Sequence, residues 1–425
     1  MTGRGIATQI HARTIHDPHV PRPHAGSGQG SHALPRGKVR GHSLENLTMN
    51  KPSVEVVNPS GSRRVVVTKN LPGQHWLDVL TAAGCRVEVA QGTDILTKDE
   101  ILALIGDRCD GAIGQLTEPW GTELFTALKN AGGSAYSNYA VGFNNVDVPA
   151  ATALGIPVGN TPGVLTETTA EIAVALTFAA SRRIVESDRF MRGGQFKGWL
   201  PTLFLGQLFH GKTVGIIGAG RIGAAYARMM VEGHKMNLVY FDVRQNTELE
   251  EYVAAYSAFL TSRGEAPVTC RRVASVEDLL READVVSLHT VLDANTRHLI
   301  NADRLGLMKA DAILVNTSRG PVVDEAALVA HCQGHPDFRA GLDVFEDEPA
   351  MKPGLAELAN VVIVPHIASA TKWTREGMAS LAACNVAAIL QGYPVSSTGD
   401  VHPFLAGTPP QAAPSIVNAA ELGLR

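Results

Sequence analysis

The sequence predicts an α/β protein with two domains, each built on a doubly wound parallel β-sheet. The chain has 425 residues, 45% of them hydrophobic and 18% charged, which is enough for two or three domains with large cores. Short apolar runs alternate with helical stretches, and this pattern favours parallel strands that are covered by helices on both faces. A glycine-rich segment follows one of these runs near the middle of the chain.

The first domain is predicted to begin near Arg64 and to cover residues 62–163 and 366–400. It is discontinuous and flavodoxin-like, because a helix at Trp373–Leu390 should cross back from the second domain. The other elements expected in this domain are Val65–Val67, the helix Trp76–Ala83, Arg86–Ala90, Gly111–Gly114 and Ile156–Val158. Residues 396–425 are rich in Pro, Gly and Ala, and we expect this tail (401–425 as a separate segment) to run over the surface.

The second domain is predicted to span residues 164–365. It should open with a long helix, Thr166–Arg183, for which Thr166 is the candidate N-cap. The irregular segment Gly193–Leu208 carries apolar residues that suggest an arm against a partner subunit. The strands of this domain are expected from Thr213 onward and at Leu238–Phe241, Val285–Leu288, Ala312–Val315, Ala340–Leu342 and Val361–Val364.

Gly218, Gly220 and Gly223 form a Gly-x-Gly-x-x-Gly motif between an apolar run and a helix. Such glycines allow a tight turn, close approach of a pyrophosphate and close packing of the helix on the strand. The next apolar run ends in Asp242, whose carboxylate suits the ribose hydroxyls and repels a 2′-phosphate. The motif predicts a Rossmann-type domain that binds NAD(H). Because Arg244 is nearby, we expect NADPH to serve more weakly.

Three polar motifs follow apolar runs of the second domain: Asn316–Gly320, Asp343–Pro349 and Pro365–Ser369. They should meet at the carboxyl edge of the sheet, where open α/β folds place ligands. Arg319 and His366 there suit reduction of a 2-keto acid, with His366 as proton donor and Arg319 as carboxylate and ketone ligand. A carboxylate should orient the imidazole, and the residues alone leave Asp343, Glu346, Asp347 and Glu348 open.

These motifs resemble the D-isomer-specific 2-hydroxyacid dehydrogenase family. Its catalytic trio is an Arg, a Glu directly before Pro and a His after Pro, which implies Arg319, Glu348 and His366. The chain is similar to the plant-type, NADH-dependent hydroxypyruvate reductase (glycerate dehydrogenase) branch over roughly residues 52–423. The stretches that carry this similarity are Asp110–Glu118, Ala140–Val148, Val158–Glu171, Tyr226–Gly233 and His366–Met378.

The resemblance implies photorespiratory reduction of hydroxypyruvate to D-glycerate, and of glyoxylate to glycolate. It implies that the N–H groups of Val141 and Gly142 bind the substrate carboxylate, together with Arg319 and Ser369. The residues implied at the cofactor site are Gly218, Gly220, Arg221, Ile222, Gly223, Asp242, His289, Thr290, Thr317, Asp343 and His366. A homodimer formed through the NAD-binding domain is implied as well, and no metal is expected.

Two alternatives stay open: another 2-keto acid reductase of the family, or a non-catalytic dinucleotide sensor that keeps the trio. Nucleic acid is not expected as a partner at a net charge of −4, and no apolar run is long enough for a membrane span.

Residues 1–50 carry six Lys or Arg against two acids and lack the apolar core of a secretory signal. We expect this segment to be disordered and to target an organelle. Because the chain ends in Leu424-Arg425 rather than a Ser-Lys-Leu-type peroxisomal signal, we predict the mitochondrion, with the chloroplast as the alternative. An extension without an address, or a true start at Met49, is the competing interpretation.

Overall fold

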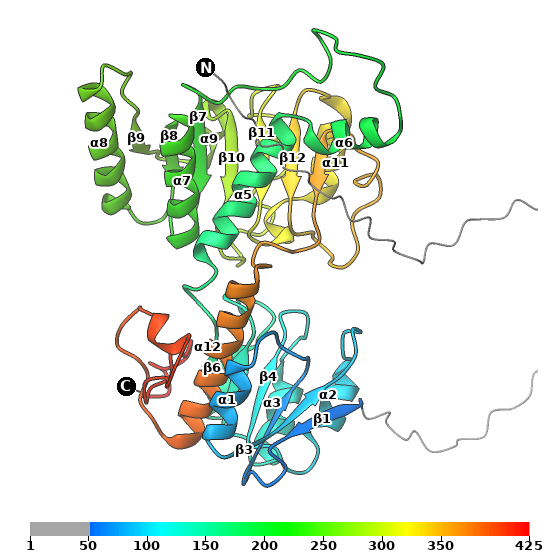
Figure 1. The fold of residues 1–425 in the computed structure, drawn as a ribbon, viewed down its shortest axis with the longest axis vertical. Coiled ribbons are helices and arrows are strands. Elements are labelled where there is room, and N and C mark those ends of the chain that lie inside the picture. The colour runs from blue at the N-terminus through cyan, green and yellow to red at the C-terminus, as the bar shows by residue number, and fades with distance from the viewer. Residues whose placement is uncertain (1–51, 425) are drawn as a thin grey trace, which may run out of the picture. The chain divides into compact units, whose positions relative to one another are not determined.

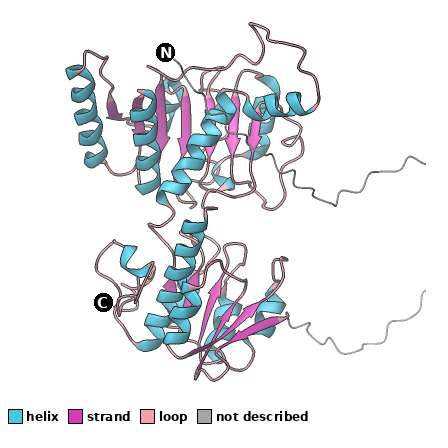
Figure 2. Ribbon diagram, in the orientation of Figure 1, coloured by secondary structure: helices cyan, strands magenta, loops and turns pink. Residues whose placement is uncertain are grey.

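The computed structural model describes residues 52–424 and contains two β-sheets, one of six strands and one of seven (Figure 1). The predicted targeting segment, residues 1–50, lies outside the described residues. Both sheets carry helices on their two faces, so the predicted fold class is confirmed (Figure 2). No helix among residues 52–424 has the length and apolar character needed to cross a membrane.

The first sheet has the strand order β1-β3-β2-β4-β5-β6. Its strands are β1 (Val54–Val57), β2 (Arg63–Val67), β3 (Cys85–Ala90), β4 (Gly111–Gly114), β5 (Ala135–Asn138) and β6 (Val158–Gly159). The pairs are parallel except β1, which runs antiparallel to β3 at the sheet edge. Folded structure therefore begins at β1, before the predicted start near Arg64. The sequence did not predict this strand because it is an edge strand with a weak apolar pattern.

Alternate residues of β2 point into two separate cores, as the two-residue period of a strand requires. Val65 and Val67 pack against α1 (His75–Ala82) and α12 (Lys372–Gln391). Val66 packs on the other face, which is covered by α2 (Lys98–Ile105), α3 (Thr122–Asn130) and α4 (Val148–Ala153). The helix α12 follows the last strand of the second sheet and returns to the first, as predicted.

The second sheet is parallel throughout, in the order β13-β12-β11-β10-β7-β8-β9. Its strands are β7 (Thr213–Ile217), β8 (Asn237–Phe241), β9 (Cys270–Arg272), β10 (Val285–Leu288), β11 (Ile313–Asn316), β12 (Arg339–Leu342) and β13 (Val361–Ile363). One face carries α5 (Thr166–Ser181), α7 (Arg221–His234) and α8 (Thr247–Ser262). The other face carries α9 (Val276–Glu282), α10 (Ala302–Leu305) and α11 (Glu325–Gly334).

The long helix predicted at Thr166–Arg183 is α5, and a second helix, α6 (Ile184–Arg192), follows it after a turn. The prediction that Thr166 is the N-cap is wrong, because Thr166 is the first residue of the helix. The N-cap is Leu165, whose side chain makes no capping hydrogen bond. Two short 3₁₀ turns, Gly320–Val322 and His402–Phe404, complete the elements.

The expectation that the C-terminal tail runs over the surface is wrong. Asn418 is fully buried, and its side chain bonds to the backbone of Ile156 and Val158. Ile416 forms an antiparallel bridge with Gly159, so the tail covers the free edge of β6. Satisfying the backbone groups of that edge strand stabilises the docked tail despite its loop-like composition.

Candidate active site

The glycine motif forms the turn that joins the end of β7 to the N-terminus of α7. Gly220 is the N-cap residue and provides no side-chain cap, so the first N–H groups of α7 are left for a ligand. A Cβ on Gly223 would stand 2.0 Å from the carbonyl oxygen of Gly218, so only glycine allows this helix to approach the turn. This arrangement fits a dinucleotide pyrophosphate.

Asp242 directly follows β8, beside the glycine turn. Its carboxylate accepts hydrogen bonds from the N–H groups of Ala219 at 2.7 Å and Arg244 at 3.0 Å. These bonds hold the carboxylate at the end of the strand, where an adenosine ribose lies in folds of this type.

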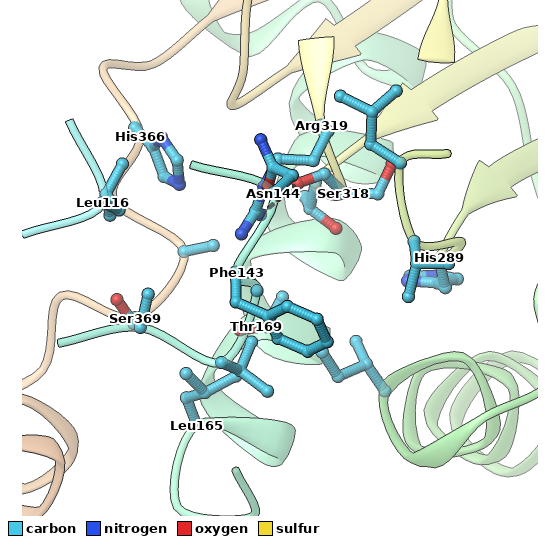
Figure 3. A pocket seen from close by; sticks show the side chains of 18 of the residues that line it. Leu116, Phe143, Asn144, Leu165, Thr169, His289, Ser318, Arg319, His366 and Ser369 are labelled. Carbon is cyan, nitrogen blue, oxygen red and sulfur yellow. Dashed lines mark hydrogen bonds between the residues drawn. The ribbon is translucent and has the colours of Figure 1, made fainter. Parts of the chain in front are cut away.

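A pocket of about 290 Å³ is lined by residues of both domains (Figure 3). The structure brings nine of the predicted site residues to its wall: Val141, Gly142, Ile222, His289, Thr290, Thr317, Arg319, His366 and Ser369. Seven others are not part of this wall: Gly218, Gly220, Arg221, Gly223, Asp242, Asp343 and Glu348. Glu348 instead lines a second cavity, of about 370 Å³, which shares His366 with the first.

Two hydroxyl groups on the pocket wall fit the polar part of a nicotinamide nucleotide. The Oγ1 atoms of Thr290 and Thr317 are buried and have no hydrogen-bond partner among residues 52–424. Buried polar atoms are seldom left unpaired, so these two point to a ligand. His289 stands beside them with its Nε2 2.9 Å from Ser287 Oγ, and burial lowers its pKa to about 3 although the residue borders the pocket. It is therefore neutral.

His366 and Glu348 are in direct contact. Nδ1 of His366 lies 2.9 Å from Oε2 of Glu348, and both side chains are about three-quarters covered. His366 has φ 52°, a left-handed conformation that costs a non-glycine residue roughly 1 kcal/mol or more and is typical of functional sites.

The neighbouring acids of Glu348 are all engaged elsewhere. Glu346 contacts His298 at 2.9 Å, and Asp347 contacts Lys352 at 2.6 Å. Asp343 is fully buried, and its carboxylate accepts from the N–H groups of Ile367 at 2.6 Å and Ala368 at 3.0 Å. Of the four candidates, Glu348 is the acid that meets the imidazole.

The charge of Glu348 is favoured by its surroundings. Burial raises the pKa of this carboxyl group, but the hydrogen bond and charge of His366, the Phe345 N–H and the charge of Arg319 together outweigh burial. The pKa therefore lies below its ordinary value. An ionised Glu348 places a negative charge beside Nδ1 of His366.

Arg319 lies against the backbone of Gly142. A Cβ at position 142 would stand 1.9 Å from Nη2 of Arg319, so the guanidinium occupies the space that a side chain would take. Burial lowers the pKa of Arg319 and the charge of Glu348 opposes this, but an arginine stays protonated in any protein environment. Figure 3 shows Arg319 meeting Asn144 in the pocket, with His366 on one side and His289 on the other.

Asn144 also lines the pocket, although no sequence pattern singled it out. Its Oδ1 accepts a hydrogen bond from Nε of Arg319 at 2.9 Å, although the two residues are 175 positions apart. Its place directly after the Val141–Phe143 turn was the available signal, but nothing local indicates that its partner is an arginine.

The turn at Val141 and Gly142 offers free backbone donors. Among residues 52–424, neither N–H group donates a hydrogen bond, and both residues line the pocket. Adjacent free N–H groups facing a cavity suit an anion such as a carboxylate.

Three features of the site define the class of protein: the dinucleotide turn, the His–Glu pair and the arginine beside free N–H groups. Together they are typical of NAD-dependent oxidoreductases that act on small acids. The NAD-binding domain of the D-isomer specific 2-hydroxyacid dehydrogenases matches residues 174–368. A glycerate dehydrogenase of Cucumis sativus is 63% identical over 380 residues, covering 88% of this chain and 100% of the relative. The peroxisomal glycerate dehydrogenase HPR of Arabidopsis thaliana is 62% identical over 381 residues, with coverages of 88% and 99%.

Among solved structures, an NADPH-dependent glyoxylate/hydroxypyruvate reductase of Sinorhizobium meliloti, in complex with NADP and malonate, is similar to the chain. Its TM-score is 0.65 and its identity 28%, with 85% of this chain and 98% of that chain covered. The chain belongs to the D-isomer-specific 2-hydroxyacid dehydrogenase family, and it is an NAD-dependent dehydrogenase.

One prediction is overturned by these comparisons. The name of the Arabidopsis relative, 62% identical, places that protein in the peroxisome. The predicted mitochondrial location, with the chloroplast as its alternative, is therefore wrong.

Proposed function

We propose that this protein reduces hydroxypyruvate to D-glycerate with NADH, and glyoxylate to glycolate as a lesser reaction. The observation that carries the proposal is the 2.9 Å contact of His366 with Glu348, beside a pocket that also holds Arg319. The glycerate dehydrogenases of cucumber and Arabidopsis, at 63% and 62% identity, support hydroxypyruvate as the substrate.

In the proposed mechanism, the substrate carboxylate accepts from the N–H groups of Val141 and Gly142, and Arg319 binds the keto oxygen and a carboxylate oxygen. Bound NADH supplies the hydride. His366, protonated in the reducing direction, donates its proton to the oxygen of the former ketone. Glu348 orients the ring through Nδ1 and balances its charge. Ser369 lies on the same wall and completes the substrate site.

For the cofactor, we propose that the α7 N-terminus and the glycine turn hold the pyrophosphate, Asp242 the adenosine ribose, and Thr290 and Thr317 the nicotinamide side. Asp343 acts from outside the pocket by fixing the segment that follows His366, through two backbone N–H groups. The carboxylate of Asp242 favours NADH over NADPH. The Sinorhizobium relative is NADPH-dependent, which supports weaker use of NADPH here.

We also propose a homodimer. The segment Gly193–Leu208 exposes large apolar side chains: Phe196 at 46%, Trp199 at 80%, Leu200 at 59%, Leu205 at 65% and Leu208 at 76%. Ile184 and Met191 of α6, next to this arm, are 51% and 56% exposed. Concentrated exposed apolar residues of this kind mark interaction surfaces, and a second copy is the occupant we propose.

The test is steady-state oxidation of NADH by the purified protein, with hydroxypyruvate, glyoxylate, pyruvate and 3-phosphohydroxypyruvate offered in parallel. We expect the highest kcat/KM with hydroxypyruvate and its loss in His366→Ala. Preference for another keto acid would support the proposed catalytic site but replace hydroxypyruvate as the proposed substrate. Tight NADH binding without turnover of any of the four would favour a dinucleotide sensor instead.

A further inference from the structure

The substrate-binding turn is held from behind by three hydrogen bonds to consecutive carbonyl groups. The oxygen of Ala140 accepts from the N–H of Thr161 at 2.9 Å. The oxygen of Val141 accepts from Nδ2 of Asn160 at 2.9 Å, and that of Gly142 accepts from Nδ2 of Asn138 at 3.0 Å. Each peptide of the turn is thus fixed on the side away from the pocket.

Fixing a carbonyl also fixes the next N–H, because the peptide unit is planar and trans. The C=O of Val141 and the N–H of Gly142 belong to one such plane and point in opposite directions. When Asn160 holds the Val141 oxygen, the Gly142 N–H is directed to the other side, where it finds no protein acceptor among residues 52–424. The orientation of this donor therefore depends on the Asn160 amide.

Asn160 is in turn fixed by the C-terminal tail. Its side chain is buried, and its Oδ1 accepts from Oγ of Ser415 at 2.6 Å. The Val141 carbonyl can only accept, so the amide nitrogen must face it, and Oδ1 then faces Ser415, whose hydroxyl donates to it. Ser415 also accepts from the Asn160 N–H through its backbone oxygen, at 3.3 Å.

A third residue, Asn385, also links the tail to Asn160. Asn385, buried in α12, accepts from the N–H of Ser415 at 2.9 Å and donates to the Asn160 carbonyl at 2.9 Å. The tail is therefore joined to Asn160 by both backbone and side chain, within a network of buried and partly buried hydrogen bonds that reinforce one another.

We infer that Ser415 and Asn160 are positioning residues for the substrate carboxylate: the docked tail directs the Gly142 N–H through them. This rests on the proposed function, in which that N–H binds the substrate. The tail would then be part of the substrate site although none of its residues lines the pocket. A purely structural role for the tail predicts lower stability without a selective effect on keto-acid binding.

The test compares Ser415→Ala, Ser415→Thr and Asn160→Asp with Asn418→Ala. Asn418 anchors the same tail to Thr152, Ile156 and Val158 and makes no hydrogen bond to Asn160 or the turn among residues 52–424, so its variant reports loosening of the tail. The measurements are KM for hydroxypyruvate, KM for NADH, kcat, Tm and inhibition by oxamate, an unreactive keto-acid analogue.

We expect Ser415→Ala to raise KM for hydroxypyruvate and Ki for oxamate about five-fold, the effect of one net hydrogen bond, with KM for NADH unchanged. Asn160→Asp, which puts an oxygen against the Val141 carbonyl, should raise both more than ten-fold. Ser415→Thr keeps the hydroxyl and should restore most of the binding.

Unchanged KM for hydroxypyruvate and Ki for oxamate in Ser415→Ala would overturn the inference. It would also be overturned if Asn418→Ala, at the same loss of Tm, raised both constants as much as Ser415→Ala does. If Asn160→Asp does not fold, the two serine variants decide. Should the wild-type protein turn over none of the keto acids, the proposed function itself fails, whereas wild-type turnover with a silent Ser415→Ala refutes the role of the tail alone.

Discussion

Glu348 and His366 come from the loops after two adjacent parallel strands, β12 and β13, and their side chains meet at 2.9 Å across eighteen positions of sequence. The pairing of the strands brings the two loops to one edge of the sheet. The buried carboxylate of Asp343 then holds the N–H groups of Ile367 and Ala368, which fixes the segment directly after His366. The geometry of the pair is thus set by the sheet and by a buried acid.

Replacing Glu348 by Gln should lower kcat for hydroxypyruvate reduction about 100-fold, within the range typical of acid–base groups. The pKa of Glu348 is lowered, so its carboxylate is ionised throughout the neutral range and places a negative charge beside Nδ1 of His366. Glu348→Gln leaves only a neutral partner at Nδ1, so its kcat/KM profile should not superimpose on that of the wild type. The measurement is the pH–rate profile from pH 5 to 9.

Glu346→Gln is the matched control, because Glu346 carries the same charge in the same loop but contacts His298 and Arg297. Its pH profile should keep the wild-type shape. A superimposable profile for Glu348→Gln would remove Glu348 from the mechanism.

Sequence patterns identified most of the central strands because these are short apolar runs buried on both faces. They missed β1 and β9, which lie at sheet edges and are only partly buried, and also the buried strand β5, whose sequence Ala-Tyr-Ser-Asn is half polar. The docked tail was missed for a related reason. Its buried side chains, among them Phe404, Ile416 and Asn418, follow no helical or strand periodicity in a Pro- and Gly-containing segment.

At the candidate site, too, sequence patterns predicted some residues and not others. Arg319 and His366 could be singled out because polar motifs directly follow buried strands. Asn144 and Asn160 could not, since their partners lie 175 and 255 positions away, at Arg319 and Ser415. A local pattern contains no information about contacts at that range.

Gly142→Ala should strongly reduce substrate turnover while leaving NADH binding intact. The added methyl group would stand 1.9 Å from Nη2 of Arg319, so the guanidinium must move away from the turn. We expect kcat/KM for hydroxypyruvate to fall more than 100-fold, as misplaced catalytic groups typically cause. Gly233→Ala, which adds a methyl group in open space on α7, is the control and should behave like the wild type. Activity within a factor of three of wild type in Gly142→Ala would contradict this packing.

Asp242→Asn should weaken the preference for NADH over NADPH about ten-fold. The amide keeps the size of the side chain and an acceptor for the Ala219 N–H but removes the charge that repels a 2′-phosphate. The side chain of Arg244, exposed two residues further on, is then available to that phosphate. The measurement is the ratio of kcat/KM values for the two cofactors at saturating hydroxypyruvate. An unchanged ratio would show that Asp242 does not select the cofactor.

Trp199→Glu combined with Leu208→Glu should convert the proposed dimer into monomers. Both side chains are more than three-quarters exposed in the single chain, so the substitutions remove no internal packing. In a dimer they would be covered, and two charges buried without partners cost several kcal/mol at each copy of the interface. Light scattering coupled to size exclusion gives the mass directly, and Tyr252→Glu, an exposed residue of α8 away from the arm, serves as control. A wild-type protein that elutes as a monomer of 45.0 kDa would refute the dimer, and the apolar arm would then need another occupant.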